Sequence, residues 1–205
     1  HKVDPILGTN EELKQLCADA KKMGIRIMLD GVFSHTGDDS RYFNKYGNYD
    51  TLGAYQSKES PYYDWYCFNN YPNGYESWWG FSTLPNVKEE NPSYMKFIIE
   101  NEDSVLKYWM KQGICGWRLD VVDELPEKFT QTFYKVLKEV DKDAVMLGEV
   151  WEDASNKSAY GVSREYLCGQ ELDSAMNYPF RQVVLDFLLG YADATQISKR
   201  LKSLM

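Results

Sequence analysis

The sequence lacks several features that would place it in common functional classes. No run approaches the about 18 consecutive apolar residues of a membrane-spanning helix, and the chain begins without the apolar run of a signal peptide. There is no glycine-rich phosphate loop. The four cysteines show no CxxC spacing, which argues against zinc; they are Cys17, Cys67, Cys115 and Cys168. Free thiols favour a reducing, cytoplasmic location, and we expect no membrane partner.

Positive charge is also in deficit. Lys and Arg total 23 against 31 Asp and Glu, which gives a net charge of −8. Like charges repel, so neither a nucleic acid nor an anionic membrane is expected as the main partner. Aromatic residues, in contrast, are abundant, with 6 Trp and 16 Tyr. Flat rings stack on the C–H faces of sugars and also fill ordinary cores, so composition alone leaves both roles open.

The spacing of apolar residues predicts helices that alternate with strands. Thr9, followed by Glu11 and Glu12, predicts a helix start. Buried strands are expected at 25–29, 116–122, 144–150 and 172–178, and helices at 92–112, 127–140, 180–191 and 196–204. This order indicates an α/β fold with parallel strands, and both a doubly wound sheet and a (β/α)8 barrel are compatible with it.

The composition changes between residues 36 and 91, where Gly, Asn, Asp, Ser, Pro and aromatic residues replace aliphatic runs. This stretch is much longer than an ordinary connection, which is typical of a functional subdomain. We therefore divide the chain into residues 1–35, an inserted segment 36–91, and residues 92–205. Five aromatic residues of the insert are candidate sugar platforms, although most are expected in its core: Tyr62, Tyr63, Trp65, Trp78 and Trp79.

Three of the predicted strands end in acidic residues, namely Asp30, Asp120 and Glu149. The carboxyl ends of parallel strands meet at one face of the sheet, so these side chains are expected to converge. Any one of them alone is more readily explained as a cap of a turn or helix. Three in series favour a site. Asp173 and Asn177, at the end of the last predicted strand, are weaker candidates.

Arg118 and Asp120 alternate along one strand and therefore point to the same side. An inward arginine requires carboxylate partners and would keep Asp120 ionised. A second acid beside an ionised one is expected to stay protonated, which predicts a proton on Glu149. Such a pair, separated by about 5–5.5 Å, is what a retaining glycosidase requires. The alternative is a structural Arg–Asp ion pair with Glu149 at the rim.

Four short segments, in this order, resemble motifs of the α-amylase superfamily, glycoside hydrolase family 13. They are Leu29–His35, Leu84–Val87, Gly116–Glu124 and Gly148–Trp151. Glu124 and the segment Gly-Glu-Val-Trp at 148–151 most resemble the motifs of the neopullulanase and cyclomaltodextrinase branch. The resemblance covers nearly the whole chain. It implies a (β/α)8 barrel in which an inserted domain B follows the third strand.

The resemblance also implies the chemistry. Asp120 would be the nucleophile that forms a covalent glycosyl intermediate, and Glu149 the acid/base, while Arg118 holds the nucleophile. His35 would bind a hydroxyl of the sugar that is cleaved, and Asp30 would be a structural acid below the site. Trp151 and Glu124 are further substrate-contact candidates. The expected partner is an α-glucan with α-1,4 links, and in some members also α-1,6 links.

The chain departs from the family pattern at several positions. Ser34 stands where the family usually has an asparagine tied to calcium, so we expect neither a structural calcium nor any other metal or cofactor. Asp123 replaces the usual Lys or Asn. His1 and His35 are the only histidines, so the His-Asp pair of the fourth motif is missing. We therefore expect an internal piece of the catalytic domain, with about strands three to six, that is inactive alone. Either two copies pair through their exposed faces, or the piece folds alone with a rearranged edge.

Two other functions stay open at this stage. A transferase or phosphorylase of the same superfamily would use Asp120 and Glu149 but pass the glycosyl group to a sugar or to phosphate. A non-catalytic carbohydrate-binding or transporter-associated relative would be expected to lose these acids, whereas Arg118, Asp120 and Glu149 are all present here.

Overall fold

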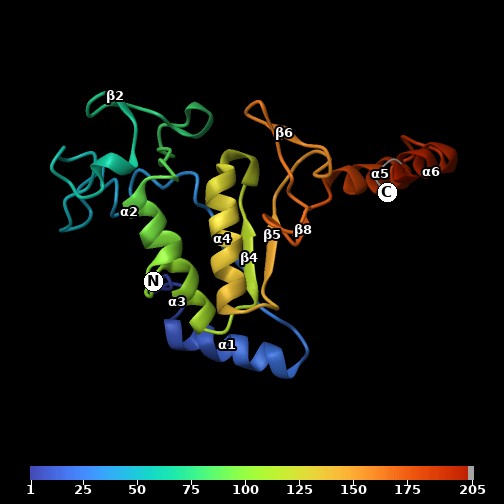
Figure 1. The fold of residues 1–205 in the computed structure, drawn as a ribbon, viewed down its shortest axis with the longest axis horizontal. Coiled ribbons are helices and arrows are strands. Elements are labelled where there is room, and N and C mark those ends of the chain that lie inside the picture. The colour runs from blue at the N-terminus through green and yellow to red at the C-terminus, as the bar shows by residue number, and fades with distance from the viewer. Residues whose placement is uncertain (203–205) are drawn as a thin grey trace.

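The computed structural model describes residues 1–202, and its centre is a four-stranded parallel sheet (Figure 1). The strands are β1 (Leu29–Gly31), β4 (Gly116–Leu119), β5 (Val145–Gly148) and β8 (Ser174–Ala175). They are neighbours in the order β1-β4-β5-β8 and all pairs are parallel. Spatial order thus follows chain order, as successive strand–helix units require.

Two helices match the sequence expectation closely. α1 (Asn10–Lys22) begins at Thr9, which forms a capping box with Glu12, and it ends before Gly24, whose φ is 78°. α4 (Glu127–Val140) buries Phe129, Phe133 and Leu137, which recur every four residues along one face. That face packs on the sheet, so α4 holds β4 and β5 in place from one side.

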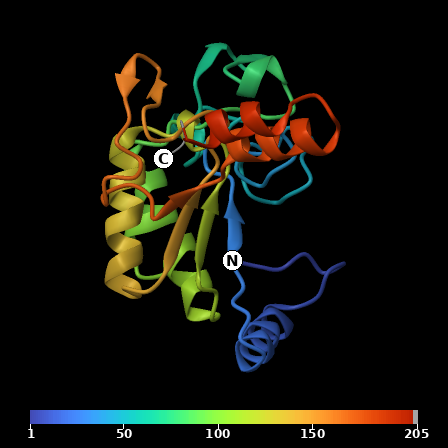
Figure 2. The same cartoon turned by 90° about the vertical axis from the view of Figure 1, so that its right-hand side faces the viewer.

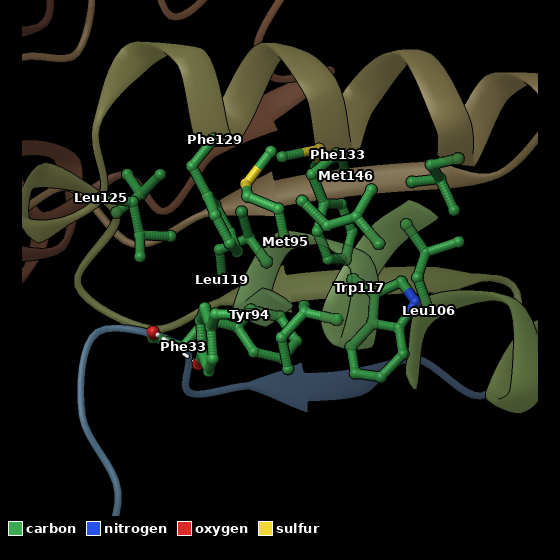
Figure 3. Packing of buried hydrophobic residues seen from close by; sticks show 14 of the residues in the cluster. Phe33, Tyr94, Met95, Leu106, Trp117, Leu119, Leu125, Phe129, Phe133 and Met146 are labelled. Atoms are coloured by element: carbon green, nitrogen blue, oxygen red, sulfur yellow. Dashed lines mark hydrogen bonds between the residues drawn. The ribbon is translucent and has the colours of Figure 1, made fainter. Parts of the chain in front are cut away.

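The core lies between α4, the helices before β4, and the sheet (Figure 3). Trp117 and Leu119 of β4 and Met146 of β5 pack there against Phe129 and Phe133. The hydroxyl of Tyr94 donates a hydrogen bond of 2.9 Å to the carbonyl oxygen of Phe33. This bond ties the segment that follows β1 to the helical layer, and it satisfies a polar group within the core.

The strands are shorter than the apolar runs predicted. The run 25–29 was expected to be a strand, but β1 begins only at Leu29, where pairing with β4 starts. Ile25 is exposed and outside the ladder. Among residues 1–202, β1 has a ladder partner on one side only, so a single neighbour sets its length. β8 is likewise reduced to two residues, paired with Leu147 and Gly148.

The expected helix 92–112 is interrupted. α2 (Pro92–Met95) runs into a π-helical turn, Lys96–Glu100, and α3 (Val105–Lys111) starts anew. The Oγ of Ser104 donates to the carbonyl of Ile99 and accepts from the amide of Lys107. Ser, Asp and Asn favour such local bonds over a continuous helix, so the sequence Asn-Glu-Asp-Ser at 101–104 ends one helix and caps the next.

The inserted segment 36–91 contains only short elements: η1 (Tyr63–Trp65), β2 (Phe68–Asn70), β3 (Gly74–Tyr75) and η2 (Trp78–Gly80). Aromatic side chains form its interior, with Phe43, Trp65 and Tyr66 all buried. Asn44, also fully buried, holds the loop together, because its side-chain amide donates to the carbonyls of Tyr49 and Thr51. The segment thus has an ordered interior despite its loop-like composition.

After β5 the chain forms a hairpin that the sequence did not predict, β6 (Ser158–Ala159) with β7 (Val162–Ser163). α5 (Tyr178–Leu188) and α6 (Ala194–Lys202) follow, while the last two residues of the expected helix 196–204 lie outside the described residues. The 36–91 segment and the hairpin both lie at the end toward which the strands point (Figure 2). Among residues 1–202, no helix combines the length and apolarity needed to span a bilayer.

Candidate active site

Arg118 is the centre of a cluster at the carboxyl ends of the strands. Its Nη1 lies 2.7 Å from Oδ1 of Asp30 and 2.6 Å from Oδ1 of Asp120, and its Nη2 lies 2.9 Å from Oε2 of Glu149. The ladder aligns Asp30 with Arg118 across β1 and β4. The three strand-end acids therefore converge on one guanidinium, and Arg118 has the carboxylate partners that its inward position requires.

The carboxylates around Arg118 together raise the pKa of its guanidinium. Desolvation lowers the pKa of its guanidinium, but hydrogen bonds to Asp30 and Asp120 and the charge of Glu149 more than offset this, so the pKa lies above its ordinary value. A planar guanidinium presents several N–H donors in a fixed fork. The two nitrogens of Arg118 thus fix Asp120 and Glu149 relative to each other.

Glu149, at the end of β5, is 7% exposed and is surrounded by donors. Oε2 accepts from the amide of Val121 at 2.9 Å, in addition to Arg118. Oε1 accepts from Nε1 of Trp151 at 3.1 Å and from the hydroxyl of Tyr178 at 2.9 Å. Each of these bonds favours a charged carboxylate.

The pKa of Glu149 is shifted in the direction opposite to the sequence expectation. Desolvation raises its pKa, but the hydrogen bonds from Val121, Trp151 and Tyr178 and the charge of Arg118 outweigh that effect, and the pKa lies below its ordinary value. The sequence argument considered only the repulsion from Asp120 and predicted a proton on Glu149. The donors around the carboxylate reverse the direction of that prediction.

Val121 connects the two acids through strained backbone. It follows Asp120 directly and has φ 36° and ψ 62°, a left-handed conformation that β-branched residues seldom adopt. This conformation directs its amide toward Glu149. Backbone strain of this kind clusters at functional sites. Sequence reasoning did not predict this conformation, because valine is an ordinary strand residue.

His35 lies beside the cluster without a hydrogen bond to it. Its Nδ1 is 3.0 Å from the Oγ of Ser34, and its ring centroid is 5.5 Å from that of Trp78. Burial lowers the pKa of His35, while the negative charges of Asp120 and Glu124 act in the opposite direction. The net effect is a pKa below the ordinary value, which favours the neutral imidazole. The influence of Asp120 and Glu124 places His35 near these acids.

The remaining candidates lie around this centre. Glu124 ends the short helix η4 (Val122–Glu124), and its carboxylate accepts a hydrogen bond from the hydroxyl of Tyr160 at the turn of the β6–β7 hairpin. Trp151 is bonded to Glu149 and is 41% exposed. The structure thus brings Glu124 to the rim of the cluster and Trp151 into direct contact with it.

Two weaker candidates do not join the cluster. Asp173 binds Nζ of Lys138 at 2.8 Å and the amide of Met146 at 2.7 Å, so it fastens α4 to the start of the sheet. Asn177 caps α5 through the amide of Phe180. Tyr178, the next residue, contacts Glu149 instead, and sequence reasoning missed it because a single tyrosine at a helix start carries no signal.

Metal-binding side chains are not gathered in the described part of the chain. Among residues 1–202, no three or more His, Cys, Asp and Glu side chains form a group that could hold an ion. Ser34 is buried, and its Oγ lies 3.0 Å from Nδ1 of His35.

Comparison with known proteins decides the family. A model of the α-amylase catalytic domain matches residues 1–204. The chain belongs to the α-amylase family. The resemblance seen in its motifs is thereby confirmed, including the relation to neopullulanases and cyclomaltodextrinases, both of which are found among its relatives at 33% identity.

Relatives within the α-amylase family differ greatly in length from this chain. An amylopullulanase from Thermoanaerobacterium thermosulfurigenes is 40% identical over 99% of this chain, which corresponds to 12% of that protein. Neopullulanase 2 from Thermoactinomyces vulgaris is 33% identical over 90% of this chain and 29% of its own length. The chain therefore spans only a small part of the curated relatives that it matches.

Solved structures of the family agree with the fold. The ligand-free cyclic α-maltosyl-(1→6)-maltose hydrolase from Arthrobacter globiformis has a TM-score of 0.84 at 29% identity, over 99% of this chain and 43% of that one. A cyclomaltodextrinase structure has a TM-score of 0.81 at 31% identity, over 98% and 32%. The four parallel strands are thus part of a (β/α)8 barrel, which excludes the doubly wound alternative.

Proposed function

We propose that the enzyme containing this chain is a retaining α-glucan hydrolase in which Asp120 is the nucleophile and Glu149 the acid/base. The observation that carries the proposal is the shared guanidinium: Arg118 bonds Asp120 at 2.6 Å and Glu149 at 2.9 Å. The retaining mechanism requires two carboxyl groups that flank one glycosidic bond, and a guanidinium shared by both acids supports that arrangement.

The reaction then proceeds in two displacements. A carboxylate oxygen of Asp120 attacks the anomeric carbon and forms a glycosyl ester, while the bond to the leaving oxygen breaks and Glu149 gives that oxygen its proton. Glu149, now ionised, takes a proton from water, and the resulting hydroxide displaces Asp120 from the sugar. Arg118 orients Asp120 and stabilises the charge that returns to it in the second step.

Glu149 must gain a proton before the first step. In the free site its pKa is held down against desolvation by the donors Val121, Trp151 and Tyr178 and by Arg118. A bound glucan excludes water and competes for the hydroxyl of Tyr178 and the indole of Trp151 through its own hydroxyls. Both changes destabilise the charged form, so substrate binding raises the pKa of Glu149 toward the value that an acid catalyst needs.

The neighbouring residues have supporting roles in this proposal. His35 hydrogen-bonds a hydroxyl of the sugar to be cleaved, and Asp30 holds Arg118 through Nη1, the same nitrogen that binds Asp120. Trp151 and Glu124 contact the substrate. Relatives named amylopullulanase, neopullulanase and cyclomaltodextrinase support α-1,4-linked glucans as substrates, with α-1,6 links as a further option. Calcium takes no part, so a chelator should leave the activity unchanged.

The stereochemistry of the product tests the proposal in the full-length enzyme. Proton NMR of maltooligosaccharide cleavage should show the α-anomer of the new reducing end first, because two displacements retain configuration. A β-anomer formed first contradicts the nucleophile assignment. Product analysis with and without an added sugar or phosphate acceptor separates hydrolysis from transfer, since only a transferase shifts its products when an acceptor is present.

The 205-residue stretch by itself should not turn over glucans, and we propose that two copies associate. Within residues 1–202, β1 and β8 each have a ladder partner on one side only, and so few strands do not close a barrel. Light scattering of the isolated stretch should give twice the monomer mass. A clean monomer at high concentration contradicts the association, and turnover at the rate of the full-length enzyme contradicts the inactivity.

A further inference from the structure

The residues that flank the β6–β7 hairpin hold the segment 123–125, which lies just beyond the end of β4. Nζ of Lys157, directly before β6, is 3.2 Å from Oδ2 of Asp123. Nη1 of Arg164, directly after β7, donates to the carbonyl oxygen of Leu125 at 2.9 Å. Contacts from both ends of the hairpin thus fix the first and last residues of this segment, and the residue between them meets the turn of the hairpin.

Tyr160 occupies that turn in an unfavourable backbone conformation. Tyr160 and Gly161 are the two residues between β6 and β7, and their φ values are 52° and 79°. Asn, Asp or Gly suits the first position of such a turn, whereas a tyrosine there is strained. Tyr160 is 76% exposed, so packing in the core does not offset the strain. Its hydroxyl, however, has a partner, because it donates a hydrogen bond to Oε2 of Glu124.

Glu124 faces the candidate active site from the other side of this bond. Its negative charge acts on the imidazole of His35. Among residues 1–202, its carboxylate accepts a hydrogen bond from Tyr160 alone, which leaves Oε1 able to accept one from a ligand. A glutamate side chain has several rotatable bonds. Holding it in one orientation before a ligand arrives removes part of the entropy cost of binding.

The hydroxyl of Tyr160 is suited to hold a carboxylate. Burial, followed by the hydrogen bond to Glu124 and the charges of the neighbouring acids, raises the pKa of Tyr160 above its ordinary value. The hydroxyl therefore keeps its proton and acts as a donor at every pH at which Glu124 is ionised. A hydrogen bond to an ionised acceptor is stronger than one between neutral groups.

We propose that Tyr160 is a positioning residue that holds Glu124 in the orientation in which it accepts a hydrogen bond from a hydroxyl of a bound glucan. This inference rests on the proposed α-glucan hydrolase function and gives the β6–β7 hairpin a part in substrate affinity. Tyr160 acts through Glu124 and neither on the sugar itself nor on the chemistry at Asp120. Its hydroxyl therefore matters only while the Glu124 carboxylate is present.

A double-mutant cycle in the full-length enzyme tests this dependence. In an Asp120→Asn background, Tyr160→Phe should weaken the binding of maltohexaose by about two- to tenfold in calorimetric titration, the range expected when one side chain must be ordered on binding. In the same background with Glu124→Ala, Tyr160→Phe should have no further effect. Tyr46→Phe is the matched control and should leave the affinity unchanged, because Tyr46 is also exposed and donates to a carboxylate, that of Asp38, within the inserted segment.

Kinetics in the active enzyme give an independent readout. Tyr160→Phe should raise KM for maltohexaose more than it lowers kcat, because the hydroxyl supports binding. Unchanged affinity after Tyr160→Phe or after Glu124→Ala would overturn the positioning role while the hydrolase function stands. An equal loss with and without the Glu124 carboxylate would overturn it as well, since Tyr160 would then act independently of Glu124. If the parent enzyme neither binds nor cleaves maltohexaose, the failure belongs to the proposed function.

Discussion

Two arginine–carboxylate clusters in this chain differ in what surrounds them. Arg118 binds Asp30, Asp120 and Glu149 at the strand ends, where the side chain of Asp30 is 57% exposed and that of Asp120 is 23% exposed. Arg164 binds Glu171 at 2.6 Å, and their side chains are only 4% and 1% exposed. The first cluster has more acids than one guanidinium can neutralise, and water reaches it.

The Arg164–Glu171 pair is buried and is surrounded by further contacts. Nη1 of Arg164 donates to the carbonyl of Leu125, Glu171 accepts from the hydroxyl of Thr130, and the guanidinium lies over the ring of Tyr166. These contacts fasten the loop that carries the β6–β7 hairpin to α4. An arginine–carboxylate contact therefore serves structure where both side chains are buried and one acid meets one arginine. The Arg118 cluster is instead accessible to water, contains three acids and adjoins strained backbone, which suits it to catalysis.

The largest expected effect is on rate, at the first cluster. Asp120→Asn or Glu149→Gln in the full-length enzyme should lower kcat for maltooligosaccharides by about 10³-fold or more, because each removes a group that acts in the transition state. Circular dichroism and thermal unfolding should change little. Turnover within tenfold of the parent enzyme would show that these acids are structural. The Arg118 cluster would then have the same role as the Arg164–Glu171 pair.

The second effect is on stability, at the buried Arg164–Glu171 pair. Arg164→Met leaves Glu171 as an uncompensated buried charge and should lower the free energy of unfolding by about 3–5 kcal/mol. Replacing both residues, Arg164→Met with Glu171→Leu, should restore much of that loss. Denaturant unfolding of the full-length enzyme measures both variants.

The exposed pair Lys22–Asp19 is the matched control for that measurement, since Lys22→Met should leave stability almost unchanged. Activity per folded molecule should survive Arg164→Met. A loss of kcat as large as that of Asp120→Asn would instead place Arg164 in the catalytic machinery.

The smallest effect is a shift in pH dependence. The hydroxyl of Tyr178 is one of the bonds that lower the pKa of Glu149. Tyr178→Phe removes it, so the pKa of Glu149 rises. Because the acid must be protonated to act, the alkaline limb of kcat/KM should move to higher pH. If the alkaline limb of kcat/KM stays unchanged or moves to lower pH, Glu149 is not the acid catalyst.

The sequence predicts this architecture well where one local pattern decides it. The capping residues around Thr9 and the four-residue spacing of Phe129, Phe133 and Leu137 correctly predict α1 and α4. The convergence of Asp30, Asp120 and Glu149 on Arg118 follows from alternation within parallel strands. These features need no knowledge of distant contacts.

Other features depend on contacts that a linear pattern does not contain. The β6–β7 hairpin has strands of two residues, too short to show an alternation. The break at 101–104 depends on Ser104 reaching the carbonyl of Ile99. The pKa of Glu149 depends on donors from Val121, Trp151 and Tyr178, which come together only when the loops after β4 and β5 and the start of α5 are in place.

The ladder between β1, β4 and β5 pairs Asp30 with Arg118 and Arg118 with Leu147. Side chains along a strand alternate between its two faces, so a slip of one residue between β1 and β4 would turn Asp30 away from the guanidinium. The register of the backbone pairing therefore determines the relative positions of the side chains around Arg118. Evolution can remodel the surrounding loops freely, while any insertion inside these three strands would dismantle the arrangement in a single step.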